Sequence, residues 1–253
     1  MDLVRVDVVT IFPEVFPGPL EAGVLGRARA RGLLELAVWD LREFTADRHR
    51  TVDALPYGGG AGMVMKAEPF VRAVEAIRAA RPEGAPTVLL TSPQGRLLTQ
   101  AWVRDLAAGA HLVVLCGRYE GVDERVAELV GAQEISIGDY VLSGGELAAL
   151  VIVEAVGRFL PGAVGDADSV AHDSFSQGLL DHPHYTRPAE FRGRKVPEVL
   201  LSGHHDAVRR WRAREALHRT LLRRPDLIDE ARLDDEARAI LHELRGPGGC
   251  RER

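Results

Sequence analysis

Only two cysteines occur in the 253-residue sequence, Cys116 at the end of an apolar run and Cys250 in a Gly- and Arg-rich tail. Their number and spacing fit neither a disulfide framework nor a zinc site. No stretch approaches about 18 consecutive apolar residues and no charged-then-apolar leader opens the chain, so membrane association and secretion are not expected. These absences predict a cytoplasmic protein, and 46% hydrophobic residues suffice for at least one sizeable core.

Familiar cofactor signatures are missing as well. The sequence contains no G-x-G-x-x-G, no Walker loop, no C-x-x-C pair and no G-x-S-x-G elbow. An ordinary dinucleotide site, a P-loop, a thiol redox pair and a serine-hydrolase elbow are therefore not expected.

The charge is unevenly distributed. The net charge of -5 argues at first against nucleic acid, but residues 187–224 carry eleven basic against four acidic side chains. That segment is therefore +7, which leaves -12 for the remainder. An acidic body with one basic region is typical of a protein that binds RNA locally, although a solvated helix face in an arginine-rich protein would give the same pattern.

Short β-branched runs alternate with helical patterns over the first 160 residues, which predicts an α/β domain with a largely parallel sheet. Strands are expected at residues 4–11, 33–39, 87–91, 112–116 and 134–137, and helices at 68–81, 99–108 and 146–159. Residues 161–173 have small and acidic side chains without a period, and indicate a flexible linker. Residues 174–253 then form a small helical domain, with helices at 204–222 and from the capping Asp234 to Leu244.

Three glycine-containing loops follow the predicted strands: residues 91–95 (TSPQG), 116–121 (CGRYEG) and 137–146 (IGDYVLSGGE). Open α/β sheets bind ligands at the carboxyl ends of their strands, and glycine permits close backbone approach there. Any one loop could be a plain turn. Three in succession, with Tyr and Glu beside the glycines, favour a nucleoside-binding site.

Several blocks of the sequence resemble those of the bacterial tRNA (guanine-N1)-methyltransferase family. They are residues 12–14 (FPE), 56–60 (PYGGG), the three loops, 173–175 (DSF), 184–188 (HYTRP) and 199–204 (VLLSGH). The blocks occur in the family's order from about residue 4 to residue 224. The resemblance implies a SPOUT-type α/β domain with a deep trefoil knot, which periodicity alone would not suggest because knots are rare. It also implies a homodimer with active sites at the subunit interface, and methylation of the guanosine immediately 3′ of the anticodon.

Site residues follow from the same resemblance. S-adenosylmethionine is expected to bind Leu90, Thr91, Ser92 and Pro93 of the first loop, Gly117, Tyr119 and Glu120 of the second, and Ile137, Gly138, Asp139, Tyr140, Val141, Leu142, Gly144 and Gly145 of the third. Asp173 aligns with the family's catalytic aspartate and Arg158 with an arginine near the reacting base. Expected tRNA contacts are Gly59, Arg187, Arg209, Arg210 and Arg214, with Arg212 a less certain candidate. The resemblance also implies dependence on Mg²⁺, for which no ligand cluster was recognised.

The sequence departs from the family pattern at two places. His172 precedes Asp173 where the family usually has an acidic residue, which changes the electrostatics expected beside the base. Ala61 stands in the glycine-rich block where proline is common.

The chemistry requires a base, because guanine N1 carries a proton at neutral pH. Asp173 can accept that proton, but with an ordinary pKa of about 3.9 it needs help. A guanidinium at O6, such as that of Arg158, would stabilise the developing negative charge. Without the resemblance, Asp173 would be interpreted as a helix or turn cap.

Other reactive side chains are given no catalytic role. Direct methyl displacement needs no covalent intermediate, so Cys116 is interpreted as a small buried residue. His182 and His184 resemble a metal-ligand pair, but no third ligand at a supporting spacing was recognised, which disfavours a metal site.

Two alternatives remain at this stage. One is another knotted methyltransferase acting on ribosomal RNA or a different tRNA position, which residues 184–188 and the basic helical domain disfavour. The other is an RNA-binding module without activity, which would need neither a methyl-donor pocket nor a base.

Overall fold

The computed structural model describes residues 3–82, 84–165, 170 and 173–246. The chain divides into two compact units, Met1–Ala167 and Asp168–Arg253. None of the helices in these described ranges is long and apolar enough to cross a membrane.

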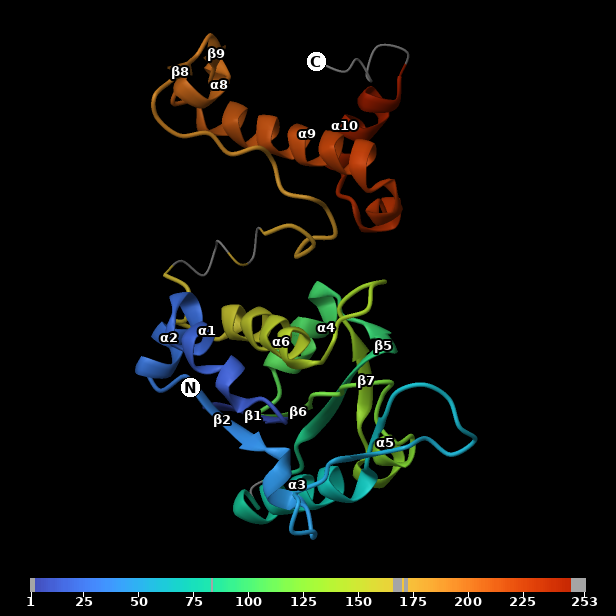
Figure 1. The fold of residues 1–253 in the computed structure, drawn as a ribbon. Helices are drawn as coiled ribbons and strands as arrows, with labels where there is room; N and C mark the ends of the chain where they lie inside the picture. The colour runs from blue at the N-terminus through green and yellow to red at the C-terminus, as the bar shows by residue number, and fades with distance from the viewer. Residues whose placement is uncertain (1–2, 83, 166–169, 171–172, 247–253) are drawn as a thin grey trace. The chain divides into compact units, whose positions relative to one another are not determined.

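A five-stranded sheet forms the centre of the N-terminal unit (Figure 1). Its order is β2-β1-β6-β5-β7, and every neighbouring pair is parallel. The strands are β1 (Val4–Thr10), β2 (Leu34–Asp40), β5 (Thr87–Leu97), β6 (His111–Leu115) and β7 (Gln133–Ser136). Each strand begins within one residue of its predicted start, so the predicted parallel α/β sheet is confirmed.

Helices cover both faces of the sheet, as expected for parallel strands (Figure 1). One apolar core joins the sheet to α1 (Pro17–Glu21), α2 (Gly23–Ala30), α4 (Gln100–Ala107) and α6 (Glu146–Phe159). The other core joins it to α3 (Ala67–Ala80) and α5 (Arg125–Val130). In α3 the buried Phe70, Ala73, Val74 and Ile77 show the spacing of an amphipathic helix.

Short elements complete the N-terminal unit. The 3₁₀ helices η1 (Pro13–Val15) and η2 (Leu41–Phe44) follow β1 and β2, and β3 (Asp53–Ala54) pairs with β4 (Val64–Met65) as an antiparallel hairpin. Local chemistry fixes several ends. Thr99 caps α4 by accepting a hydrogen bond from the Trp102 backbone N–H at 3.3 Å, and Gly131 ends α5 at φ 68°.

The C-terminal unit is mainly helical. It contains α8 (Glu198–Leu201), α9 (His205–Arg223), α10 (Asp235–Arg245), the short helices η3 (Pro225–Leu227) and η4 (Glu230–Arg232), and a hairpin of β8 (Glu190–Phe191) and β9 (Arg194–Lys195). Its core consists of Leu217 of α9, Leu233, and Ile240, Leu241 and Leu244 of α10. Asp234 caps α10 by accepting from the Ala237 backbone N–H at 2.7 Å, as predicted.

The segment expected to be a linker, residues 161–173, begins inside the N-terminal unit. Ala163 is 1% exposed within that unit's core, and the Gly162 carbonyl accepts a hydrogen bond from Arg31 at 2.6 Å. Residues 166–169 and 171–172, including His172, lie outside the described residues.

Candidate functional site

The first candidate loop is a bulge within β5. Thr91 and Arg96 both lie opposite Ile135 of β7, so the residues between them leave the ladder. Gly95 lies in this bulge, and a Cβ there would be 2.3 Å from the Ile135 backbone nitrogen. Only glycine therefore allows the bulge to lie this close to β7.

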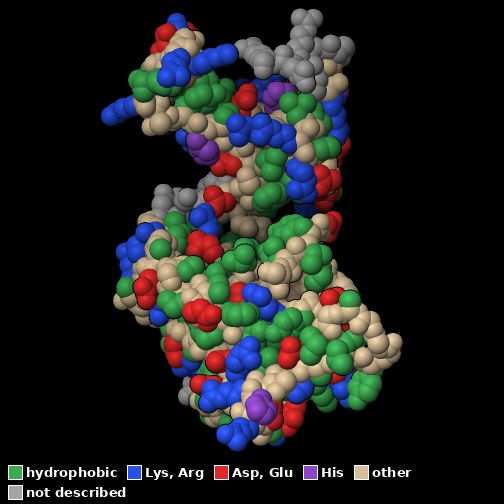
Figure 2. Space-filling view, in the orientation of Figure 1, with side chains coloured by type: hydrophobic (Ala, Val, Ile, Leu, Met, Phe, Trp, Pro, Cys, Tyr) green, Lys and Arg blue, Asp and Glu red, His purple; other side chains and the backbone are tan. Residues whose placement is uncertain are grey.

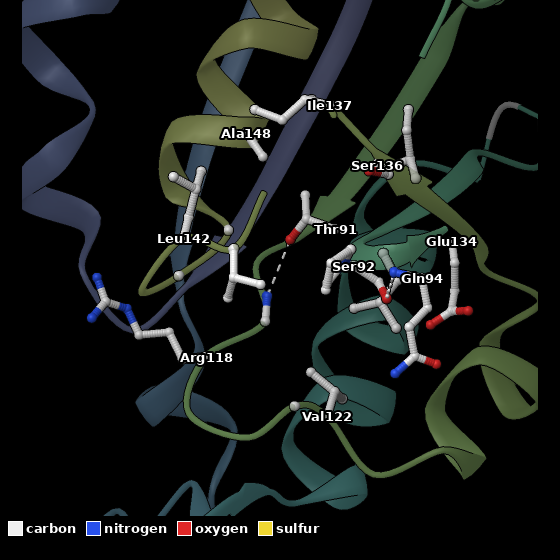
Figure 3. A pocket seen from close by; sticks show the side chains of 18 of the residues that line it. Thr91, Ser92, Gln94, Arg118, Val122, Glu134, Ser136, Ile137, Leu142 and Ala148 are labelled. Carbon is white, nitrogen blue, oxygen red and sulfur yellow. Dashed lines mark hydrogen bonds between the residues drawn. The ribbon is translucent and has the colours of Figure 1, made fainter. Parts of the chain in front are cut away.

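The second loop begins where β6 ends. Thr91 links the first two loops, because its hydroxyl donates to the Leu115 carbonyl at 3.1 Å and accepts from the Gly117 backbone N–H at 3.3 Å (Figure 3). Tyr119, in the same loop, has a left-handed backbone with φ 61°. The turn presents Tyr119 and Glu120 beside the bulge of β5.

The third loop connects β7 to α6. Gly138 has φ 150°, and a Cβ there would be 2.4 Å from the Tyr140 ring. The Tyr140 hydroxyl donates to the Ile137 carbonyl at 3.2 Å, and the Gly138 N–H donates to the Ser136 hydroxyl at 3.2 Å. The turn thus folds the tyrosine ring over glycine, which a larger residue would prevent.

The third loop also contacts the second. The Gly145 N–H donates to the Gly117 carbonyl at 2.8 Å. A Cβ on Gly145 would lie 2.0 Å from the Thr91 hydroxyl oxygen and 2.9 Å from the Cys116 Cα. Residues from all three loops therefore meet at Gly145, with α6 beginning at the next residue.

Together the loops line one cavity of about 340 Å³ (Figure 3). Every residue expected to bind the cofactor lines this cavity except Asp139. Residues that were not predicted also line it. They are Gln94, Arg118, Gly121, Val122, Glu124, Ala127, Glu134, Ile135, Ser136, Ser143 and Ala148. Several of these residues lie inside or next to the predicted loops, so their position in the sequence could have identified them.

A buried ion pair supports the loops. Glu146, the first residue of α6, is 2% exposed and accepts a 2.8 Å hydrogen bond from the Thr10 hydroxyl at the end of β1. Its other carboxylate oxygen lies 3.3 Å from Arg118 Nε, and the Arg118 guanidinium lies 4.2 Å from the centre of the Phe12 ring. Three chain segments distant in sequence are thereby fixed around the cavity. Burial, with the nearby Glu146 charge, raises the pKa of the Cys116 thiol well above its usual range, so this cysteine is not a nucleophile at neutral pH.

Arg158 does not line this cavity. Arg158 lies in the last turn of α6, whereas the cavity adjoins the first turn. At a rise of about 1.5 Å per residue, roughly 18 Å of helix separates the two positions. Asp173 belongs to the C-terminal unit, where its carbonyl accepts from the Ser176 N–H at 3.1 Å.

The expected tRNA contacts lie on separate elements. Gly59 has φ 77° in the turn between β3 and β4, and Arg187 precedes a cis proline. Arg209 and Arg210 of α9 both pair with Glu236 of α10. Arg214 pairs with Glu243 at 2.9 Å. Figure 2 accordingly shows basic and acidic side chains side by side on the C-terminal unit.

Comparisons with known proteins identify the family. A family model described as "tRNA (Guanine-1)-methyltransferase TrmD" matches residues 4–230. Proteins named tRNA (guanine-N(1)-)-methyltransferase are similar over almost the full length. The one from Dictyoglomus turgidum is 51% identical, covering 96% of this chain and 97% of the relative. The one from Geobacter metallireducens is 53% identical (95% and 97%), and the one from Halorhodospira halophila is 56% identical (95% and 90%). The chain belongs to the tRNA (guanine-1)-methyltransferase family.

Proposed function

We propose that this protein methylates N1 of a guanosine in tRNA, namely the guanosine at position 37, immediately 3′ of the anticodon. The observation that carries the proposal is the convergence of three glycine-bearing loops on one cavity at the carboxyl edge of a parallel sheet. A module that only bound RNA would have no need of such a pocket. The family relationship supports the same reaction.

S-adenosylmethionine is the proposed methyl donor. The cavity lies at the lower end of the range for small-molecule sites, roughly 300–1,000 Å³, and glycines from the second and third loops line it, among them Gly117, Gly138 and Gly145. The predicted residues of the three loops would hold the donor, and Glu120, Glu124 and Glu134 would supply the carboxylates of the lining. When bound, S-adenosylmethionine supplies an electrophilic methyl group on a sulfonium.

Asp173 is the proposed base. In this proposal its carboxylate accepts the N1 proton of guanine, which frees the lone pair for attack on the methyl group. The Arg158 guanidinium donates hydrogen bonds to guanine O6, where negative charge grows as N1 loses its proton. One well-placed donor of this kind contributes about 3–4 kcal/mol to the transition state.

A homodimer with shared sites explains why Arg158 lies far from the cavity of its own chain. Leu147 and Val151 occupy one exposed stripe of α6, at 57% and 46% exposure, and the neighbouring Val141 is 82% exposed. Exposed apolar side chains grouped beside a ligand cavity favour a protein partner. A second copy seated on this stripe would bring its own residues to the rim of the cavity, in an isologous two-fold contact.

Further parts of the proposal follow the family. The N-terminal domain, residues 1–160, is proposed to contain the trefoil knot, and residues 161–173 to act as a linker. The helical domain, residues 174–253, would then bind tRNA through Arg187, Arg209, Arg210 and Arg214, with Gly59 contributing from the other domain. Dependence on Mg²⁺ is included without an assigned site. Because tRNA is its substrate, the enzyme would work in the cytoplasm.

Complementation between inactive variants tests the shared site. Asp173→Ala removes the base, and Gly138→Trp obstructs the donor loop. We mix the two chains under conditions of subunit exchange and measure methyl transfer from labelled donor to tRNA, mapping the methylated base. A heterodimer then has one site with both halves intact, so activity returns although neither parent is active.

The controls separate the parts of the proposal. Each variant alone, taken through the same exchange, must stay inactive. If heterodimers form and no activity returns, each site belongs to one chain. If the wild-type protein itself places no methyl group on N1 of guanosine 37, the proposed function is wrong.

A further inference from the structure

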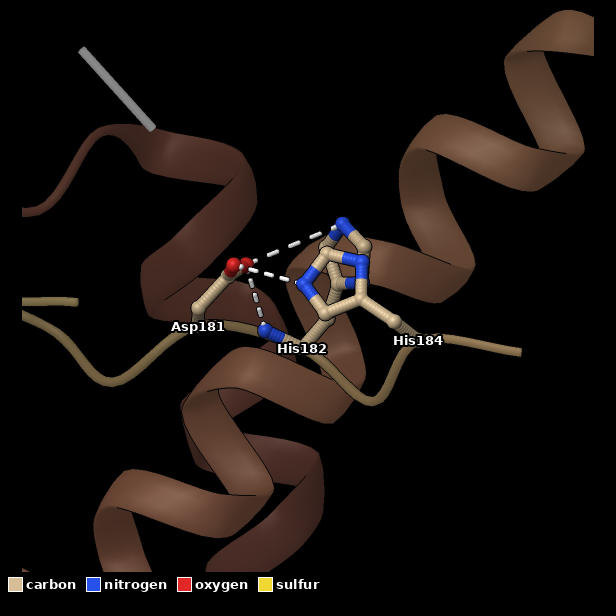
Figure 4. A group of neighbouring side chains, drawn as sticks. All are labelled: Asp181, His182 and His184. Carbon is tan, nitrogen blue, oxygen red and sulfur yellow. Dashed lines mark hydrogen bonds and ion pairs between the residues drawn. The ribbon is translucent and has the colours of Figure 1, made fainter. Parts of the chain in front are cut away.

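Asp181, His182 and His184 bring three ligand atoms together in the C-terminal unit (Figure 4). These atoms lie within 4.8 Å of one another, and the two imidazole rings have centroids 4.5 Å apart. His184 Nε2 is 2.8 Å from one Asp181 carboxylate oxygen, and His182 Nε2 is 3.7 Å from the other. From the sequence alone, His182 and His184 are a histidine pair without a third ligand. Asp181 corrects that interpretation.

The distances suit a small divalent ion. Zinc binds imidazole nitrogen at about 2.0–2.1 Å and carboxylate oxygen at about 2.0–2.2 Å, so ligands at neighbouring corners of a tetrahedron are roughly 3.4 Å apart. The two observed nitrogen–oxygen distances, 2.8 Å and 3.7 Å, lie on either side of that value. The two distances end on different Asp181 oxygens, so coordination through one oxygen requires a rotation of the carboxylate and of the rings.

The hydrogen bond of His182 to its neighbour sets its tautomer. His182 Nδ1 lies 3.2 Å from the Pro183 carbonyl oxygen, which can only accept, so Nδ1 carries the proton. In the neutral ring Nε2 then presents a lone pair towards the Asp181 carboxylate, which also only accepts. A cation between the two groups resolves this opposition. Metal-binding histidines commonly donate their other ring N–H to a backbone carbonyl in this way.

Hydrogen bonds to the backbone beside the cluster hold it in place. The Leu180 N–H donates to the hydroxyl of Thr220, a fully buried residue of α9, at 2.9 Å. The Asp181 N–H donates to the Ser174 hydroxyl at 2.9 Å. The His184 side chain is 70% exposed, which gives solvent and ions access to the cluster. The ligand atoms are thus partly preorganised and reachable.

We propose that Asp181, His182 and His184 form a three-ligand site for a divalent transition metal, with Zn²⁺ as the preferred ion and water as a fourth ligand. Two imidazole nitrogens and one carboxylate suit zinc, whereas Mg²⁺ prefers an all-oxygen set. A bound ion would fix the turn of residues 181–184, next to the point where Leu180 is hydrogen-bonded to Thr220 of α9. It does not depend on the proposed methyl-transfer function.

Calorimetry on the full chain, without a histidine tag and after removal of bound metal, tests the site directly. We expect Zn²⁺ to bind with one-to-one stoichiometry at neutral pH. Asp181→Asn keeps the size of the side chain, and His184→Ala changes an exposed residue, so both should fold. Each should weaken binding by about tenfold or more, the effect that loss of even an outer-shell partner produces. His49→Ala, at an exposed histidine of the N-terminal unit, is the matched control and should bind like wild type.

Co²⁺ gives a second readout. The Trp211 ring lies 6.3 Å from the His182 ring, so bound Co²⁺ should quench Trp211 fluorescence and show the intense visible bands of tetrahedral coordination. Trp211→Phe should abolish the quenching and leave the bands. The proposal is overturned if Zn²⁺ does not bind, or if Asp181→Asn and His184→Ala bind it as tightly as the His49→Ala control. Octahedral, weakly absorbing Co²⁺ in the wild type would equally overturn it.

Discussion

Gly145→Ala tests whether the three loops depend on one point of close approach. The added Cβ would lie 2.0 Å from the Thr91 hydroxyl oxygen, whereas ordinary contact begins at 3.4 Å. Thr91 must therefore move, and its hydroxyl holds the Leu115 carbonyl and the Gly117 N–H. Overpacking costs about 1–3 kcal/mol and each lost hydrogen bond about 1 kcal/mol, so we expect roughly 3–5 kcal/mol of destabilisation.

A double-mutant cycle assigns the cost to Thr91. Thr91→Ala alone should cost about 1–2 kcal/mol, because it removes the hydroxyl and its two hydrogen bonds. Gly145→Ala added to Thr91→Ala should then cost at least about 1 kcal/mol less than it does alone, since the nearest clashing atom is gone. Urea unfolding in a Trp211→Phe background measures this, because the remaining tryptophans, Trp39 and Trp102, belong to the N-terminal unit.

Gly18→Ala is the matched control for Gly145→Ala. Gly18 in α1 has open space where a Cβ would lie, so Gly18→Ala should be neutral or stabilise by up to about 1 kcal/mol. If the effects of Gly145→Ala and Thr91→Ala add within about 0.5 kcal/mol, the hydroxyl is not the obstacle. The strain would then come from the backbone of the second loop, and the reasoning would be refuted.

Other perturbations give distinct outcomes. Asp173→Ala should abolish methyl transfer and leave the donor's Kd nearly unchanged by calorimetry; normal turnover would reduce Asp173 to a structural role. Glu146→Gln should cost about 1–3 kcal/mol in urea unfolding and weaken donor binding, because it leaves Arg118 half-buried without its charge partner; unchanged donor affinity would contradict this. Glu236→Gln should tighten tRNA binding, since it releases Arg209 from an ion pair; weaker binding in a filter assay would count against α9 as the tRNA surface. The hydrogen bond from Arg209 and its charge hold the pKa of Glu236 below its usual 4.5. The ionised carboxylate therefore stabilises the fold above pH 4.5, and this stabilisation is lost as the pH falls through the lower pKa of the folded state. Unfolding of Glu236→Gln should therefore depend less on pH below about 4.5, and identical pH profiles would refute that.

Short-range patterns predicted the five strands of the sheet and the longer helices α3, α4, α6, α9 and α10, but not the shorter α1, α2, α5 and α8. Strand and helix positions follow from side-chain period and from caps such as Thr99 and Asp234, all of which are local in sequence. The bulge in β5 was not predicted, because the continuation of the strand to Leu97 depends on its pairing with Ser136 of β7. The β8–β9 hairpin was missed for the same reason. Two-residue strands carry no period of their own.

The site was predicted in part. Its loops are continuous in sequence and rich in glycine, so they were visible. The buried carboxylate of Glu146 was not, because its hydrogen-bond partner Thr10 is 136 residues away. Asp181 was not predicted as a ligand although it is close in sequence to the two histidines. It adjoins His182 in sequence, and only the folded backbone shows that the carboxylate turns towards both rings.

Ion pairing changes how the arginines of α9 should be ranked as tRNA contacts. The sequence count made residues 187–224 strongly positive, yet Arg209, Arg210 and Arg214 pair with acidic residues of α10, outside that range. Exposed pairs contribute at most about 1 kcal/mol, so a phosphate can displace each carboxylate, but the carboxylate then remains nearby and repels the RNA. Arg212 is exposed on the same helix, and no carboxylate lies within ion-pair distance of it in the ranges that the structure describes. Its whole charge is available to a phosphate. Arg212, the less certain candidate from the sequence, therefore has a stronger physical claim to contact a phosphate than Arg209, Arg210 or Arg214.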